Sequence, residues 1–202
     1  LWPLSIRGVI TKAVRGWNRA MYVDVIDLRD FYATPLGVAC ATSIDAEIER
    51  MWPAAPDDRV VGLGYCLPWM ERWRNGAERV LSFMPAAQGA LQWPSASPSL
   101  TALVHPEQLP VADSSVDRLL MVHLLVQSEN PVATLGEAWR VLVPGGRLLI
   151  VVPNRTGLWA RFEMTPFGTG RPFSRGQIGR LLRDSLLTPL RWSDALHFPP
   201  MT

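Results

Sequence analysis

The chain has 202 residues, of which 48% are hydrophobic and 19% are charged, and its formal net charge is +2. This composition excludes a disordered chain, and the length predicts one folded domain with a sizeable core. No apolar run reaches the roughly 20 residues of a membrane span, and the scattered arginines form no basic stripe of the kind that binds nucleic acid. Cys40 and Cys66 lack metal-ligand spacing, so we expect reduced thiols in a cytoplasmic protein and no metal site.

The first segments of the chain are predicted to be an extension and a helix. Residues 1–29 are mildly basic and lack the apolar region and cleavage site of a signal peptide, so we expect an N-terminal extension outside the domain. Residues 30–51 predict a helical leader with Ser43 as a helix N-cap, because the apolar side chains after it recur at helical spacing. These side chains are Ile44, Ile48 and Met51.

Strands and helices are then predicted in alternation. Helices are expected at residues 67–77, within 129–146 and at 174–185, the last of them capped by Ser174. Apolar runs predict strands at residues 59–63, 78–84, 100–105, 116–125 and 147–153, and a further strand is possible within 187–196.

This alternation predicts an α/β fold within residues 30–202, with a mostly parallel sheet covered by helices on both faces. In such folds the ligand binds beyond the carboxyl ends of the strands, where the strand order reverses. We therefore expect the functional loops to follow the strand ends. Those ends are Leu63, Met84, His105, His123 and Val152.

The stretch RVVGLGYCLP (59–68) runs from a predicted strand into Gly62 and Gly64. A glycine pair of this kind is common at nucleotide-binding turns, but it also occurs often by chance. A dinucleotide-dependent dehydrogenase is disfavoured, because both the third glycine and the acidic residue about 20 positions further on are missing.

Two later stretches carry a more specific pattern. LPVADSSVDRLLMVHLL (109–125) and EAWRVLVPGGRLLIVVPN (137–154) resemble class I S-adenosylmethionine-dependent methyltransferases, most of all the group related to ubiquinone-biosynthesis methyltransferases. The resemblance covers about residues 57–155. It implies a Rossmann-like fold, S-adenosylmethionine as the cofactor and an unidentified, small acceptor. The family's sheet usually ends with a further strand. Since the chain stops at Thr202, we expect either a truncated chain without that strand or a sheet completed by something else, including a partner chain.

The resemblance also implies site residues. His123, at the end of the fourth strand, is the candidate general base, although a structural histidine under the cofactor loop fits equally well. The family's ribose-binding carboxylate is replaced by Met84, with Gln88 as the nearest polar alternative, and His105 stands where an aspartate meets the adenine. Tyr65 could partly fill the pocket. The implied cofactor-binding residues are Gly62, Leu63, Gly64, Tyr65, Met84, Pro85, Gln108, Leu109 and His123.

Because several acidic positions of the family are changed, a second function stays open. The chain could be a catalytically inactive, methyltransferase-like binding or regulatory subunit that has lost the cofactor. Losing several charge-assisted contacts would weaken cofactor binding by orders of magnitude.

The long loop 154–173 is the candidate acceptor-binding element. Trp159, Arg161 and Arg171 in it would suit an apolar acceptor with an anionic group, clamped by arginine. The alternative is that the aromatic side chains pack the loop down and the arginines are solvated.

Tryptophans in the first half of the chain predict an interaction surface. If several are exposed, we expect a homodimer or a partner protein at that surface. The residues concerned are Trp52, Trp69, Trp73 and Trp93.

Overall fold

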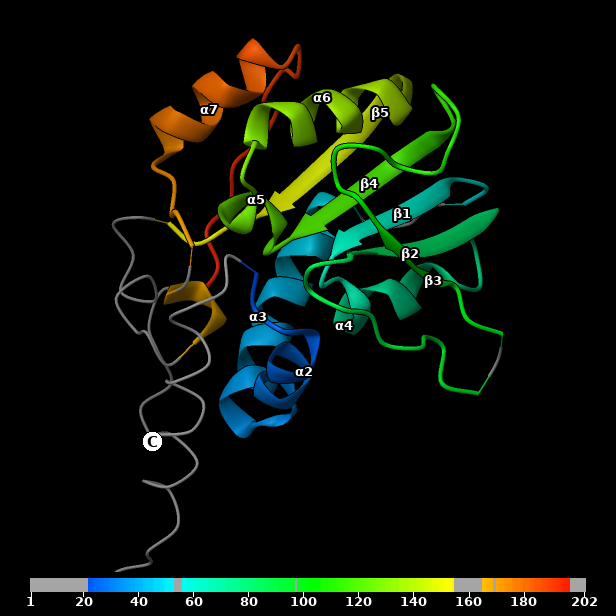
Figure 1. Ribbon diagram of the computed structural model, residues 1–202, viewed down its shortest axis with the longest axis vertical. Coiled ribbons are helices and arrows are strands. Elements are labelled where there is room, and N and C mark those ends of the chain that lie inside the picture. The colour runs from blue at the N-terminus through cyan, green and yellow to red at the C-terminus, as the bar shows by residue number, and fades with distance from the viewer. Residues whose placement is uncertain (1–21, 53–55, 97, 155–164, 169, 197–202) are drawn as a thin grey trace, which may run out of the picture.

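The protein is a single parallel sheet with helices on both faces (Figure 1). The computed structural model describes residues 22–52, 56–96, 98–154, 165–168 and 170–196. Five strands pair in the order β3-β2-β1-β4-β5, so the strand order reverses between β1 and β4, which is where open α/β sheets bind their ligands. The strands are β1 (Arg59–Gly64), β2 (Arg79–Pro85), β3 (Thr101–Val104), β4 (Val116–Val122) and β5 (Leu142–Val151).

The helices divide between the two faces, and each face has its own apolar core. On β4, Leu120 and Val122 point to the first core, whereas Leu119 and Met121 point to the second, as the two-residue period of a strand requires. The helices α2 (Val25–Ala33), α3 (Pro35–Met51) and α4 (Leu67–Met70) cover the first face, and α5 (Leu124–Gln127), α6 (Pro131–Val141) and α7 (Arg175–Asp184) lie on the other side of the sheet (Figure 1).

The predicted leader helix is in fact two helices. Thr34 has extended backbone, with φ −73° and ψ 157°, because the proline that follows it disfavours the helical conformation there. Its hydroxyl donates to the Phe31 carbonyl and accepts from the Gly37 N–H, so one residue ends α2 and begins α3. Ser43 lies inside α3, and its predicted role as an N-cap is wrong. The first helix begins at Val25, ahead of the expected domain boundary at residue 30.

Two other elements differ from expectation, whereas α7 does not. The helix expected at 67–77 is only α4 followed by a 3₁₀ turn, η1 (Glu71–Trp73). The fourth strand ends at Val122, because His123 adopts left-handed backbone with φ 59° and α5 follows. The helix α7 has the predicted Ser174 cap, in a capping box with Gln177.

The last described segment, residues 185–196, is not a strand, so the strand considered possible there is wrong. Leu187 packs against the core under α6, whereas Ala195 and Leu196 pack against the core under α3. The segment therefore passes from one face of the sheet to the other around the β5 side. Another short 3₁₀ turn, η3 (Pro166–Gly168), precedes α7.

The tryptophan surface predicted from the sequence is wrong. Trp52, Trp69 and Trp73 are each at most 4% exposed and belong to the core between α3, α4 and the sheet, and Trp93 packs against the same core. Among the described tryptophans, Trp139 and Trp192 are exposed, so an interface built on the four predicted tryptophans loses its basis. Among the described helices, none combines the length and apolar character that crossing a bilayer requires.

Candidate active site

The turn after β1 is shaped by two glycines. Gly64 has φ 91°, and a Cβ atom there would lie 2.4 Å from the Val122 carbonyl oxygen. At Gly62 a Cβ would lie 2.8 Å from both the Cys66 Cβ and the Met70 sulfur. The Tyr65 N–H then donates to the Val122 carbonyl at 3.3 Å. Only glycine permits this approach, which brings the end of β1 directly against the end of β4.

His123 follows β4 beside this turn and is almost completely buried, with 1% exposure. Its Nε2 lies 2.7 Å from the Tyr32 hydroxyl. Burial lowers the pKa of His123 to about 4, so the imidazole is neutral near pH 7. Burial also raises the pKa of Tyr32 well above its ordinary value, so the phenol keeps its proton. We assign the Tyr32 hydroxyl as the donor and Nε2 as the acceptor, because this satisfies the buried O–H group.

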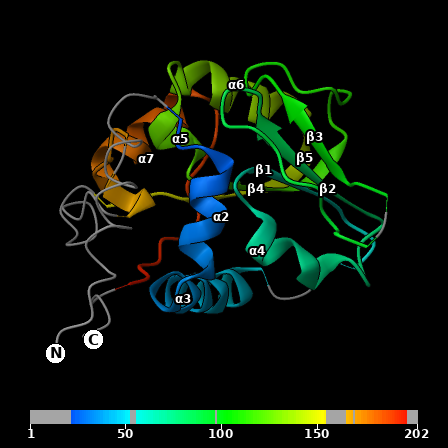
Figure 2. The same cartoon turned by 60° about the horizontal axis from the view of Figure 1, so that its bottom comes forward.

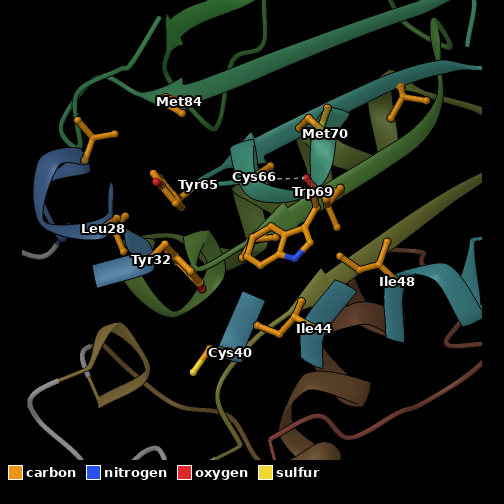
Figure 3. Close-up of a cluster of buried hydrophobic side chains, with 14 of the residues drawn as sticks. Leu28, Tyr32, Cys40, Ile44, Ile48, Tyr65, Cys66, Trp69, Met70 and Met84 are labelled. Carbon is orange, nitrogen blue, oxygen red and sulfur yellow. Dashed lines mark hydrogen bonds between the residues drawn. The ribbon is translucent and has the colours of Figure 1, made fainter. Parts of the chain in front are cut away.

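Tyr32 sits in an aromatic slot (Figure 3). Its ring stacks on Tyr65, with ring centroids 5.5 Å apart and planes inclined by 11°. Two further rings meet it edge-on: Trp69 at 5.5 Å and 86°, and its own chain neighbour Phe31 at 5.1 Å and 79°. Tyr65 is only 4% exposed, and burial raises its pKa to about 12. The slot is the space between Tyr65, Trp69 and His123. It offers a ring to stack on, an edge-on ring contact and a hydrogen-bond acceptor, which are supplied by these three residues in that order.

The end of β2 is apolar and closed. Met84 is fully buried in the cluster that also contains Leu28, Tyr32 and Tyr65 (Figure 3). The side chain of Gln88 lies beyond it, 2% exposed, and its Oε1 has no hydrogen-bond partner among the described residues. No carboxylate therefore stands at this strand end.

The start of α2 spans the carboxyl edge of the sheet. The Val25 N–H donates to the Gln88 carbonyl at 2.9 Å, after β2, and the Val23 N–H donates to Gln127 Oε1 at 3.4 Å, in α5. Figure 2 shows α2 lying between α5 and α3. The Gln127 Nε2 has no partner within the described part of the chain. The helix α2 packs over these strand ends, where the turn, Met84 and His123 are all buried.

Of the predicted site residues after β3, two are exposed to solvent and one is buried in the fold. His105 and Gln108 are exposed and face each other in an isolated bridge. Leu109 is buried, and its N–H donates to Glu137 Oε1 at 2.5 Å. Arg140 donates to the same carboxylate at 2.6 Å and lowers the pKa of Glu137. Leu109 thus belongs to a network that fixes the loop to α6, and Gln108 is the accessible member of the predicted pair.

The acceptor loop is described only in part. Trp159 and Arg161 lie outside the described residues. Arg171 is exposed, and its backbone N–H donates to the Val126 carbonyl at 2.8 Å, so the end of this loop is attached to α5, close to the covered strand ends.

Sequence reasoning missed Tyr32 as a member of the site. Tyr32 does not stand at the end of a strand, and the helix that carries it gave no pattern that points to the strand ends. Gln127, in contrast, follows the fourth strand closely in the sequence. The signal for Tyr32 was an aromatic pair, Phe31-Tyr32, in the segment read as a simple leader helix.

Comparisons with known proteins agree with this architecture. Residues 60–150 match the family described as a methyltransferase domain. No curated protein matches the chain.

Solved structures give the same fold at low sequence identity. A Thermotoga maritima protein, described as an S-adenosylmethionine-dependent methyltransferase and possible histamine N-methyltransferase, is 19% identical with a TM-score of 0.59, covering 80% of this chain and 76% of its own. An S-adenosylmethionine-dependent methyltransferase from Aquifex aeolicus is 15% identical with a TM-score of 0.60, covering 80% and 87%. The cyclase SpnF is 18% identical with a TM-score of 0.58, covering 88% and 67%.

The matched residues contain β1, the glycine turn, β4 and almost all of β5, which are the elements that build the site. The cofactor of such domains is S-adenosylmethionine. The match and the neighbours do not distinguish the ubiquinone-biosynthesis group from other members. Residues 60–150 thus match a methyltransferase domain, and the chain has the fold of the S-adenosylmethionine-dependent methyltransferases among the solved structures.

Proposed function

We propose that the chain is an S-adenosylmethionine-dependent methyltransferase acting on a small-molecule acceptor. The observation that carries this proposal is the glycine turn, Gly62–Gly64, at the point where the strand order reverses between β1 and β4. A cytoplasmic location is part of the proposal, supported by two buried free cysteines, Cys40 and Cys66.

The described residues fit one end of the cofactor and not the other. The backbone of Gly62, Leu63 and Gly64 suits the amino-acid end, because a turn without side chains lets a ligand approach the main chain. The ribose has no carboxylate to bind, since Met84 and Pro85 are buried and apolar. The glycine turn, Met84 and His123 are buried beside α2, and we propose that the cofactor enters when this helix moves. In this proposal Gln108 is an exposed contact beyond β3.

His123 is the candidate general base in this proposal. Its imidazole is neutral, and Nε2 accepts a hydrogen bond from a hydroxyl group, which is the geometry that a base needs toward an acceptor O–H or N–H. The loop residues Trp159, Arg161 and Arg171 remain the proposed acceptor-binding residues.

Titration with S-adenosylhomocysteine tests the proposal. We expect saturable binding by isothermal calorimetry and a matching rise in the melting temperature. The absence of heat and of stabilisation at millimolar ligand would contradict it and would support the inactive binding subunit, which no comparison favours.

Gly64→Ala and Gly145→Ala make a matched pair for this titration. Both glycines have positive φ, but a Cβ at Gly145 meets nothing within 4 Å, whereas at Gly64 it meets the Val122 carbonyl. We expect Gly145→Ala to bind S-adenosylhomocysteine like the wild type and Gly64→Ala to lose binding. An equal loss of S-adenosylhomocysteine binding in both variants would show that the glycine turn is not part of the binding site.

A further inference from the structure

We propose that Tyr32 occupies, from within the chain, the place of an aromatic hydroxyl ligand. The slot between Tyr65, Trp69 and His123 would receive a phenol ring when α2 lifts from the strand ends. This inference rests on the proposed function, because it names the acceptor class for the same site.

The contacts of Tyr32 are those that a bound phenol would make. One ring face lies on Tyr65, the ring edge meets Trp69, and the hydroxyl lies 2.7 Å from His123 Nε2. Stacked and edge-on contacts are the preferred arrangements of aromatic rings. A phenolic ligand therefore reproduces every aromatic and polar contact of the slot, and it needs no new group from the protein.

The conformation of His123 adds an independent observation. Its φ of 59° is uncommon for a residue with a side chain, and such backbone clusters at ligand sites. The conformation ends β4 and turns the imidazole toward α2 rather than into the sheet. A histidine needed only for packing would not require it.

The chemistry of the slot selects a neutral ligand. The groups that raise the pKa of Tyr32 besides burial are Cys40, Tyr65 and Cys66, all of them uncharged near pH 7. The charged groups that act on Tyr65 are Arg29 and Asp30, which pair with each other and act in opposite directions. A charged ligand would thus be buried with little net compensation, at high cost. Because neutral Nε2 accepts a hydrogen bond, the ligand must carry a donor, which a phenol does and its methyl ether does not.

Two buried amide groups indicate that the closed arrangement is incomplete. Gln88 Oε1 and Gln127 Nε2 have no partner among the described residues, and they stand on either side of the start of α2. Leaving such groups unpaired destabilises the closed state, and opening returns both to water or to a ligand. The helix joins α3 only through Thr34, which has extended backbone and can serve as the hinge.

The experiment uses p-cresol, which is the side chain of tyrosine, with 4-methylanisole as the same ring without an O–H donor. On wild-type protein at millimolar p-cresol, we expect faster hydrogen–deuterium exchange at residues 25–33 and unchanged exchange in β4. No change in α2 at saturating p-cresol, or no binding at millimolar concentration, would overturn the proposal.

Variants then locate the site. In Tyr32→Ala we expect p-cresol to bind at least about tenfold tighter than in the wild type, and about tenfold tighter than 4-methylanisole. Adding His123→Asn, which tolerates left-handed backbone, should abolish that preference. Phe31→Ala is the matched control, because it removes the neighbouring buried ring and leaves Tyr32 in the slot. Equal binding of the two probes to Tyr32→Ala, or an equal gain in Phe31→Ala, would contradict the slot.

These measurements need no cofactor. If S-adenosylhomocysteine fails to bind while the p-cresol results hold, the methyltransferase proposal fails and the slot stands. If S-adenosylhomocysteine binds but p-cresol does not speed exchange in α2, the proposal of a phenolic acceptor fails and the methyltransferase proposal stands.

Discussion

The Tyr32 hydroxyl lies 2.7 Å from Nε2 of His123, although the two residues are 91 positions apart in the chain. The contact joins the N-terminal helix α2 to the end of the central strand β4. His123 stands beside the glycine turn. The contact therefore also holds α2 over the sheet edge, which is where this fold binds its ligands.

Tyr32→Phe tests the energetic weight of this contact. The substitution keeps the ring stack and removes the hydroxyl that donates to the buried Nε2 of His123, so we expect a loss of about 1–3 kcal/mol in the free energy of unfolding. Urea denaturation measures it. Tyr22→Phe is the control, because Tyr22 is only half-buried, and we expect a change within about 0.5 kcal/mol. Equal effects of the two substitutions would count against a strong Tyr32–His123 bond.

Burial of His123 predicts an acid-sensitive fold. Its pKa is about 4 in the folded protein and about 6.5 when unfolded, so between these values the unfolded chain binds more protons. Stability should therefore rise with pH across this window and fall as the pH drops from 6.5 to 4, by about 3 kcal/mol in total. Denaturation curves at several pH values measure the slope.

The control for this pH dependence is a pair of variants. His123→Asn should flatten the slope between pH 4 and 6.5, whereas Tyr22→Phe, which keeps His123 in place, should retain it. Below about pH 5 other groups contribute as well, because Asp117 and Glu137 have lowered pKa values in the folded protein. A slope that survives in His123→Asn would assign the effect elsewhere.

Arg140→Met should weaken the loop that follows β3. The substitution leaves the carboxylate of Glu137, whose side chain is 9% exposed, without its positive partner. It also removes the hydrogen bonds to the Leu109 and Val111 carbonyls. We expect a loss of about 3 kcal/mol, measured by urea denaturation.

Asp113→Asn provides the comparison for Arg140→Met. Asp113 pairs with the same arginine, but its side chain is 78% exposed, so we expect less than about 1 kcal/mol. If Asp113→Asn proved as damaging as Arg140→Met, the exposed arm of the network rather than Glu137 would hold the loop.

Gly64→Ala and Gly145→Ala should also separate in stability. Both residues have positive φ, which costs an alanine about 1 kcal/mol. Gly64→Ala adds a clash with the Val122 carbonyl at the junction of β1 and β4, so its loss should exceed that of Gly145→Ala by about 2 kcal/mol or more. Thermal unfolding of the two variants measures the difference, and similar melting temperatures would show that the junction relaxes.

The sequence by itself determined the sheet and its turns. The apolar runs that became Arg59–Gly64 and Val116–Val122 predict strands buried on both faces. A run of apolar residues can be recognised from neighbouring positions alone, without knowledge of the tertiary structure. The glycine turn and the Ser174 cap were predictable for the same reason, since each follows from residues a few positions apart.

Only the tertiary structure decided what covers the sheet edge. Whether Trp52 and Trp69 are exposed depends on how α3 and α4 pack, and the amphipathic pattern does not distinguish a core face from a partner face. The position of Tyr32 in the slot depends on the helix break at Thr34. Because of this break, α2 lies over the end of β4, which is far from α2 in the sequence. Contacts across 91 positions leave no local pattern, so the sequence predicted a site at His123 and the fold decided that Tyr32 closes it.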